Sequence, residues 1–155
     1  MAHLDQPSQQ HNTDMPLYSV RGIIIATILG SIAAGVLMIA LNYVALGREH
    51  LAKTVGLAGI GIFLGFIGIT LLLPQSLTVA FLFTAGQAFI AYFVADRLQG
   101  AAIAYHSEHG RPMHSSLRAA LVGFLTGTTL FFMLILLTAL YMTITGQVPE
   151  GMAQP

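Results

Sequence analysis

"GIIIATILGSIAAGVLMIALNYVALG", residues 22–47, contains no charged side chain and is long enough to cross a lipid bilayer. An α-helix rises 1.5 Å per residue, so about 20 residues span a hydrocarbon core of about 30 Å. The run is longer than the apolar core of a signal peptide, about 7 to 15 residues, and Arg21 is the only Lys or Arg before it. We therefore predict a retained transmembrane helix at about residues 22–46, with cleavage as a signal peptide as the alternative.

Three further runs, residues 54–73, 77–95 and 119–142, are free of Asp, Glu, Lys, Arg and His. Because lipid offers the backbone no hydrogen bonds, each run is expected to be an α-helix. Only 8% of the 155 residues are charged and 55% are hydrophobic, against about a quarter charged in soluble domains. We predict an all-α integral membrane protein, a four-transmembrane-helix bundle over residues 22–146. Residues 1–21 are expected to form a disordered tail and residues 147–155 a C-terminal tail.

Proline, glycine and serine residues predict where the helices end and begin. Pro74 cannot continue the second helix and Ser76 can cap the third, which predicts a tight hairpin. The third helix is expected to continue past Ala95 into the cytoplasm, until Gly110 offers a C-terminal cap and Pro112 prevents continuation.

Lys and Arg residues predict the orientation in the membrane. If four helices each cross once, the first and third connections share one side, and Arg21 lies on the other side. Cytoplasmic loops carry the excess of Lys and Arg. Both termini are therefore predicted to be periplasmic and these two connections cytoplasmic. The five basic residues of the connections are Arg48, Lys53, Arg97, Arg111 and Arg118.

Charge and composition exclude several classes of function. The formal net charge is zero, so the chain lacks the basic field with which proteins hold nucleic acid. It has no cysteine, which excludes disulfides, thiol nucleophiles and thiolate metal ligands. None of the four runs contains an ionisable residue, and proton-coupled transporters need one within the membrane.

The stretch HSEHGRPMH, residues 106–114, holds three histidines and a glutamate and raises the question of a metal site. His106 and His109 would share a helix face, and His50 lies in the other cytoplasmic connection. The spacing does not match the H-E-x-x-H frame of zinc enzymes. A solvated loop at the headgroup boundary is the favoured interpretation, so we predict no metal, no cofactor and no enzymatic activity.

Small residues and one amide are the candidate contact residues within the membrane. Gln87 lies near the middle of a span, where its amide must find a partner, and such interhelical bonds contribute about 0.6 to 2 kcal/mol. We expect it to join helices rather than to touch a substrate. Small residues recur at spacings of four, which lets helix backbones approach; packing within the chain is the favoured role, and self-association or partner docking is the alternative. They are Ala26, Gly30 and Ala34, then Gly61 and Gly65, then Gly123 and Gly127.

Several short motifs of the first helix follow a recognisable order: Ala26-Thr27, Leu29-Gly30-Ser31, Ala34-Gly35, Asn42-Tyr43 and Ala45-Leu46-Gly47. Through these motifs, residues 19–49 resemble the first hydrophobic segment of small uncharacterised bacterial membrane proteins. In that pattern a phenylalanine stands at the place of Ile28 and a proline at the place of Ile32. The resemblance implies a bacterial inner membrane and names no activity.

Three functional hypotheses remain. The first is a non-enzymatic inner-membrane protein that acts through protein contacts in the bilayer; its most specific form, by analogy in size and span number, is an immunity protein against a membrane-targeting toxin of the type VI secretion kind. The alternative is an oligomeric channel or transport subunit, with Gln87 and threonines of the fourth helix along the path. A membrane metalloenzyme using the histidines ranks last. The expected partners are the lipid bilayer, a toxin or other membrane protein, or a second copy of the chain.

Overall fold

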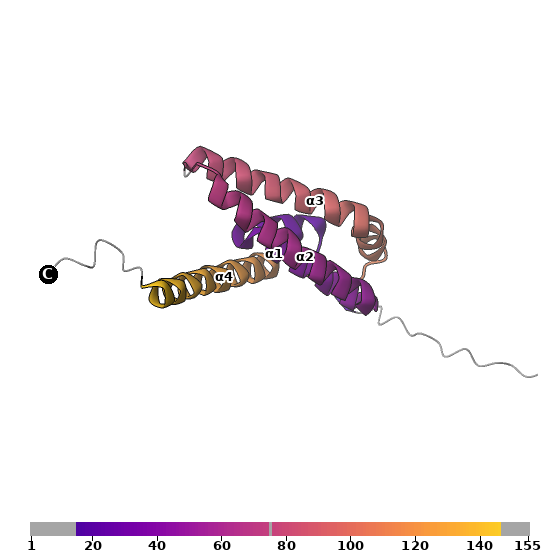
Figure 1. The fold of residues 1–155 in the computed structure, drawn as a ribbon. Coiled ribbons are helices and arrows are strands. Elements are labelled where there is room, and N and C mark those ends of the chain that lie inside the picture. Colours follow the sequence, from indigo (N-terminus) through magenta and orange to yellow (C-terminus); the bar gives the residue numbers. More distant parts are fainter. Residues whose placement is uncertain (1–14, 75, 147–155) are drawn as a thin grey trace, which may run out of the picture.

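The computed structural model describes residues 15–74 and 76–146, which fold into four α-helices (Figure 1). The helices are α1 (Val20–Ala45), α2 (Glu49–Leu72), α3 (Leu77–Glu108) and α4 (Ser116–Thr145). Each is long and apolar enough to cross a membrane. The predicted all-α, four-helix membrane fold is therefore confirmed. The predicted C-terminal tail and residues 1–14 of the predicted N-terminal tail lie outside the described residues.

Serine side chains set the beginnings of three helices. The Oγ atoms of Ser19, Ser76 and Ser115 accept hydrogen bonds from backbone N–H groups of the first turns of α1, α3 and α4. An N-terminal turn leaves such donors without helical partners, so each cap removes an unpaired polar group. The cap at Ser115 lets α4 begin a few residues before the charge-free run that predicted it.

The first helix is broken in its middle. Gly30 and Ser31 have non-helical backbone angles, and Ser31 has φ 65° and ψ −178°. The backbone N–H of Tyr18 donates to Asn42 Oδ1 over 2.7 Å, although residues this far apart in a straight helix would be separated by about 36 Å. α1 is therefore a hairpin of two half-helices, residues 20–29 and 32–45. Each half is shorter than the hydrocarbon core, at about 15 and 21 Å.

Folding α1 back on itself brings the segment before it to the α3–α4 connection. Leu17 forms a parallel bridge with Met113, the N–H of His114 donates to Leu17 O over 2.9 Å, and the rings of Tyr18 and His114 lie 4.2 Å apart. Leu17 and Tyr18 are 0% and 4% exposed. Within the predicted tail, Leu17 and Tyr18 are thus part of the buried fold, whereas Met15 is 43% exposed.

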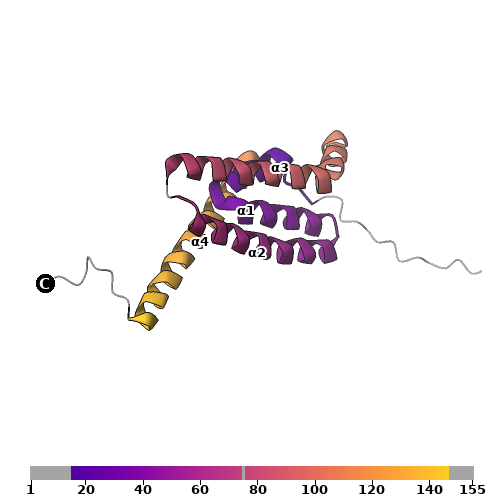
Figure 2. The ribbon, with the colours of Figure 1, turned by 45° about the horizontal axis from the view of Figure 1, so that its top comes forward.

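The two ends of the described chain consequently lie at opposite ends of the molecule, whereas the sequence predicted both termini on one side. Met15 lies with the α1–α2 and α3–α4 connections, and α4 runs from there to Thr145 at the far end (Figures 1 and 2). That prediction assumed that α1 crosses once as a straight rod, and the sides of the membrane on which the termini lie stay a prediction.

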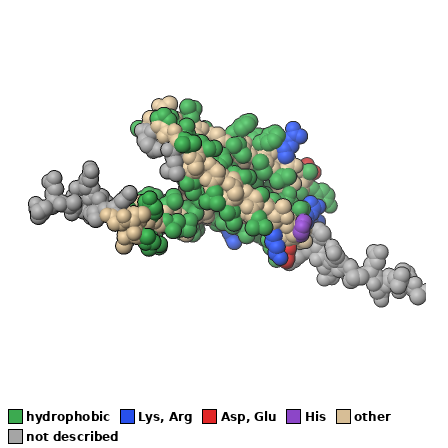
Figure 3. Space-filling view, in the orientation of Figure 1, with side chains coloured by type: hydrophobic (Ala, Val, Ile, Leu, Met, Phe, Trp, Pro, Cys, Tyr) green, Lys and Arg blue, Asp and Glu red, His purple; other side chains and the backbone are tan. Residues whose placement is uncertain are grey.

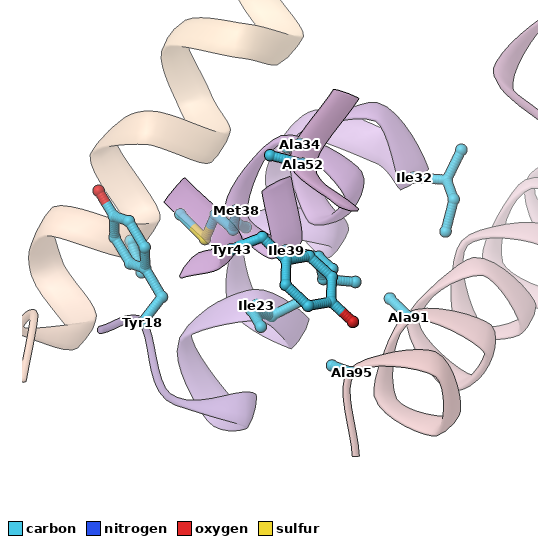
Figure 4. Close-up of a cluster of buried hydrophobic side chains, with 12 residues drawn as sticks. Tyr18, Ile23, Ile32, Ala34, Met38, Ile39, Tyr43, Ala52, Ala91 and Ala95 are labelled. Carbon is cyan, nitrogen blue, oxygen red and sulfur yellow. The ribbon is translucent and has the colours of Figure 1, made fainter. Parts of the chain in front are cut away.

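The hairpin α1 occupies the centre of the fold. It packs against α2, α3 and α4, while no described Cα atom of one of these three helices lies within 8 Å of another of them. The buried cluster is built mainly from α1, with Ile23, Met38 and Ile39 against Ala91 and Ala95 of α3 (Figure 4). The outer helices turn large apolar side chains outward, as lipid-facing helices do (Figure 3).

Candidate functional site

The break in α1 is held by an amide from another helix. The N–H of Ile32, which begins the second half-helix, donates to Gln87 Oε1 over 2.8 Å, and both residues are buried. Without this acceptor the break would leave a donor unpaired where no water is present. A proline at this position would have no N–H to satisfy. Gln87 thus supplies the acceptor that the Ile32 N–H needs and that a proline, which has no N–H, would not need.

Glycines carry the crossing of α1 and α4. A Cβ on Gly123 would lie 2.6 Å from Ala26 Cα, and one on Gly127 would lie 2.7 Å from Leu29 O. A Cβ on Gly30 would collide with the backbone carbonyl oxygen of Gly123. The two backbones touch, so nothing larger than hydrogen fits at these positions. Ala34 lies on the same part of α1 and is 0% exposed.

Two of the predicted contact residues are not brought into the bundle. Cβ atoms on Gly61 and Gly65 of α2 would meet nothing within 4 Å, and the same holds for Gly68. These three residues share one helix face because they are four and three positions apart. We call this face, Gly61, Gly65 and Gly68, the glycine face of α2. It points away from Gly59, whose Cβ would collide with Val36 of α1.

A buried network of amide side chains joins α1 to the C-terminal part of α3. Asn42 Nδ2 donates to Tyr18 O over 2.9 Å and to Gln99 Oε1 over 3.0 Å, and Gln99 Nε2 donates to Ile39 O over 2.8 Å. Asn42 and Gln99 are each 1% exposed. The network ties both ends of the α1 hairpin to α3. Sequence reasoning missed Gln99, which lies beyond the predicted span.

The signal that could have found Gln99 is the spacing along α3. Its buried residues recur every four positions, so they form one continuous face against α1. The face consists of Gln87, Ala91, Ala95, Gln99 and Ile103.

A groove separates α2 from α4 across the hairpin. One cavity of about 540 Å³ opens beside the break and is lined by Ser31, Phe63 and Leu134 among others. A second, of about 410 Å³, is lined by Val36, Gly59 and Phe63 among others. The lining of the groove is mainly apolar. The hydroxyls of Thr70 and Thr138 reach the first cavity, and each donates to a backbone carbonyl of its own helix.

The histidines of residues 106–114 do not gather. His106 is 4% exposed, and its Nε2 has no hydrogen-bond partner among the described residues. His109 is exposed and bonds through Nδ1 to Tyr105 O over 2.8 Å. His114 lies against Tyr18, and burial followed by the nearby Arg118 charge lowers the pKa of His114 below its ordinary value. Within the described chain no group of three His, Asp or Glu side chains could hold a metal ion.

No protein-family model, curated protein or solved structure matches this chain.

Proposed function

We propose that this chain is a non-enzymatic protein of the bacterial inner membrane that binds a transmembrane helix of another protein through the glycine face of α2. The observation that carries the proposal is the open space at Gly61, Gly65 and Gly68. Each glycine inside a helix costs about 1 kcal/mol relative to alanine. At the α1–α4 crossing this cost is offset by backbone contact. On the glycine face nothing within the described chain offsets it.

The chemistry of the face fits a helix better than a solute. Small residues four apart let a second backbone approach closely, and transmembrane helices associate through such packing because lipid gives them no hydrophobic driving force. Leu72 is on the same side of α2, seven positions after Gly65, and is 86% exposed. A partner helix that crosses the glycine face would therefore also cover Leu72.

A channel or transport subunit receives less support from the geometry. Gln87, which the channel hypothesis would place along a path, accepts through Oε1 the hydrogen bond of the Ile32 N–H. The hydroxyl of Thr126 donates to Val122 O within α4. These groups serve the fold, and a path would need others.

The orientation that we propose places residues 15–18 and the α1–α2 and α3–α4 connections in the cytoplasm and the end of α4 in the periplasm. With α1 folded back, Arg21 lies toward the same end of the molecule as the five other Lys and Arg residues. All six basic residues are then on the proposed cytoplasmic side, where Lys and Arg are in excess. A periplasm-active reporter should be active when fused after residue 155 and inactive when fused before residue 1. Activity of the N-terminal fusion would contradict this orientation.

The narrower proposal is an immunity protein whose partner is a membrane-targeting toxin. It is supported by a contact surface that lies within the bilayer, where such a toxin acts, and by small size. A second copy of the chain is the alternative partner for the same face.

A photo-crosslinking experiment in native membranes tests the proposal. A photoreactive residue at Leu72 should yield one discrete adduct, and Gly65→Leu in the same chain should abolish it while the protein level stays normal. Gly86→Leu is the matched control, because Gly86 of α3 is equally open but has no glycine three or four positions away. Mass spectrometry of the adduct identifies a partner protein or a second copy. An adduct unchanged by Gly65→Leu, or no adduct, would overturn the proposal.

A further inference from the structure

A third cavity lies at the basic end of the molecule, apart from the glycine face and the α2–α4 groove. It has a volume of about 310 Å³. Its walls come from segments that the α1 hairpin brings together: the segment before α1, the end of α1, and the α3–α4 connection with the start of α4. The residues that matter for its chemistry are Tyr18, Leu41, Val44, His114 and Arg118.

One side of this cavity carries the positive charge of Arg118, which has no counterion among the described residues. Within residues 15–74 and 76–146, Arg118 makes no ion pair and no Asp or Glu lines the cavity. Arg118 lies in the first turn of α4, where the helix dipole adds partial positive charge. Burial and the Arg118 charge both lower the pKa of His114, so the imidazole next to the guanidinium stays neutral more readily and can donate one N–H.

The other side of the cavity is apolar and open toward lipid. Leu41 and Val44 are 39% and 46% exposed on the second half-helix of α1. They lead from the charged rim toward the hydrocarbon region, since α1 runs from its end at Ala45 into the membrane. A free anion would satisfy Arg118 and leave this apolar side without a partner.

We propose that this cavity binds an anionic phospholipid of the adjoining leaflet, with its headgroup phosphate at Arg118 and His114 and an acyl chain along Leu41 and Val44. Arginine forms strong charge-assisted hydrogen bonds with phosphate oxygens. Basic pockets between membrane helices are suited to anionic headgroups. The lipid would bridge the segment before α1 to α4, since Tyr18 and Arg118 stand on different walls of the cavity.

The test compares lipids on the purified full-length protein in neutral detergent micelles. Native mass spectrometry would count bound phosphatidylglycerol and phosphatidylcholine of identical chains, and thermal unfolding would be followed with each lipid and with inorganic phosphate alone. The wild type is expected to retain phosphatidylglycerol in preference and to unfold at a higher temperature with it. Inorganic phosphate is expected to leave the unfolding temperature unchanged.

Variants locate the site. Arg118→Gln should weaken phosphatidylglycerol binding about five-fold, the factor that corresponds to about 1 kcal/mol per basic residue near an anionic surface. Arg48→Gln is the control, because Arg48 is at the same end but does not line the cavity. If Arg118→Gln fails to fold, His114→Gln carries the same test.

Three outcomes of the lipid-binding comparison would overturn the proposal. They are equal retention of both lipids by the wild type, an unchanged lipid preference in the folded variant, and an equal loss in Arg48→Gln. Stabilisation by inorganic phosphate that equals the effect of phosphatidylglycerol would also overturn it, because the cavity would then bind a free anion.

Discussion

The α1–α4 crossing and the glycine face of α2 use the same residue at the same spacing in opposite surroundings. At the crossing, Gly123 and Gly127 lie against the backbone of α1, and a Cβ would collide with it. On α2, Gly61 and Gly65 face open space. Small residues four positions apart therefore indicate that another helix backbone can approach. Only the fold decides whether the approaching backbone belongs to the same chain. Substitutions on α4, α1 and α2 test this difference.

The largest effect is expected at the crossing. Gly123→Leu would push α4 away from Ala26, and overpacking of this kind costs about 3 kcal/mol at the upper end of its range. We expect little folded protein in membranes and a lowered thermal unfolding temperature for what remains. If the level and the unfolding temperature both match the wild type, α4 does not cross α1 as described.

The amide at the break should follow. Gln87→Leu leaves the N–H of Ile32 buried without an acceptor, which costs about 1 to 3 kcal/mol. Ile32→Pro removes that N–H, so the double variant Gln87→Leu, Ile32→Pro is expected to be more stable than Gln87→Leu alone. Unfolding in mixed micelles would measure all three proteins. A double variant that is less stable than either single variant would show that the bond is not the reason for the cost.

A smaller gain is expected at Ser31. Its φ of 65° with ψ of −178° lies in a region that side chains strongly disfavour and glycine adopts readily. The hydroxyl offers little in return, since Ala33 N is 3.4 Å from it. Ser31→Gly should raise the stability by about 1 kcal/mol, measured by the same unfolding experiment. Ser31→Ala, which keeps the Cβ and removes the hydroxyl, should not, and serves as the control.

The smallest effect on stability is expected on the glycine face. Gly61→Leu and Gly65→Leu add side chains that meet nothing in the protein, so neither should lower the free energy of unfolding, and the better helix propensity of leucine should raise it by less than about 1 kcal/mol. Binding of the partner should be lost in the same proteins. Destabilisation as large as that of Gly123→Leu would place the glycine face inside the fold and remove its distinction from the crossing.

Much of the helical content could be predicted from the charge-free runs, because in lipid an α-helix satisfies the backbone hydrogen bonds within a single segment. The reversal of α1 could not be predicted. Its turn is Gly30-Ser31 within an unbroken apolar run, and Ser31 adopts a conformation that its residue type disfavours. What stabilises the turn comes from far along the chain, as with Gln87. The burial of His106 could not be predicted either, because it depends on how α3 packs against α1.

The α1 hairpin also decides how much polar chain must be moved through the membrane during biosynthesis. In the orientation that we propose, the hairpin enters the bilayer and leaves it on the side from which it came, so that among the described helices α2, α3 and α4 cross completely. Residues 1–14 contain two aspartates and two histidines, and carrying such side chains through hydrocarbon is costly. The orientation that we propose requires no transfer of that segment across the membrane.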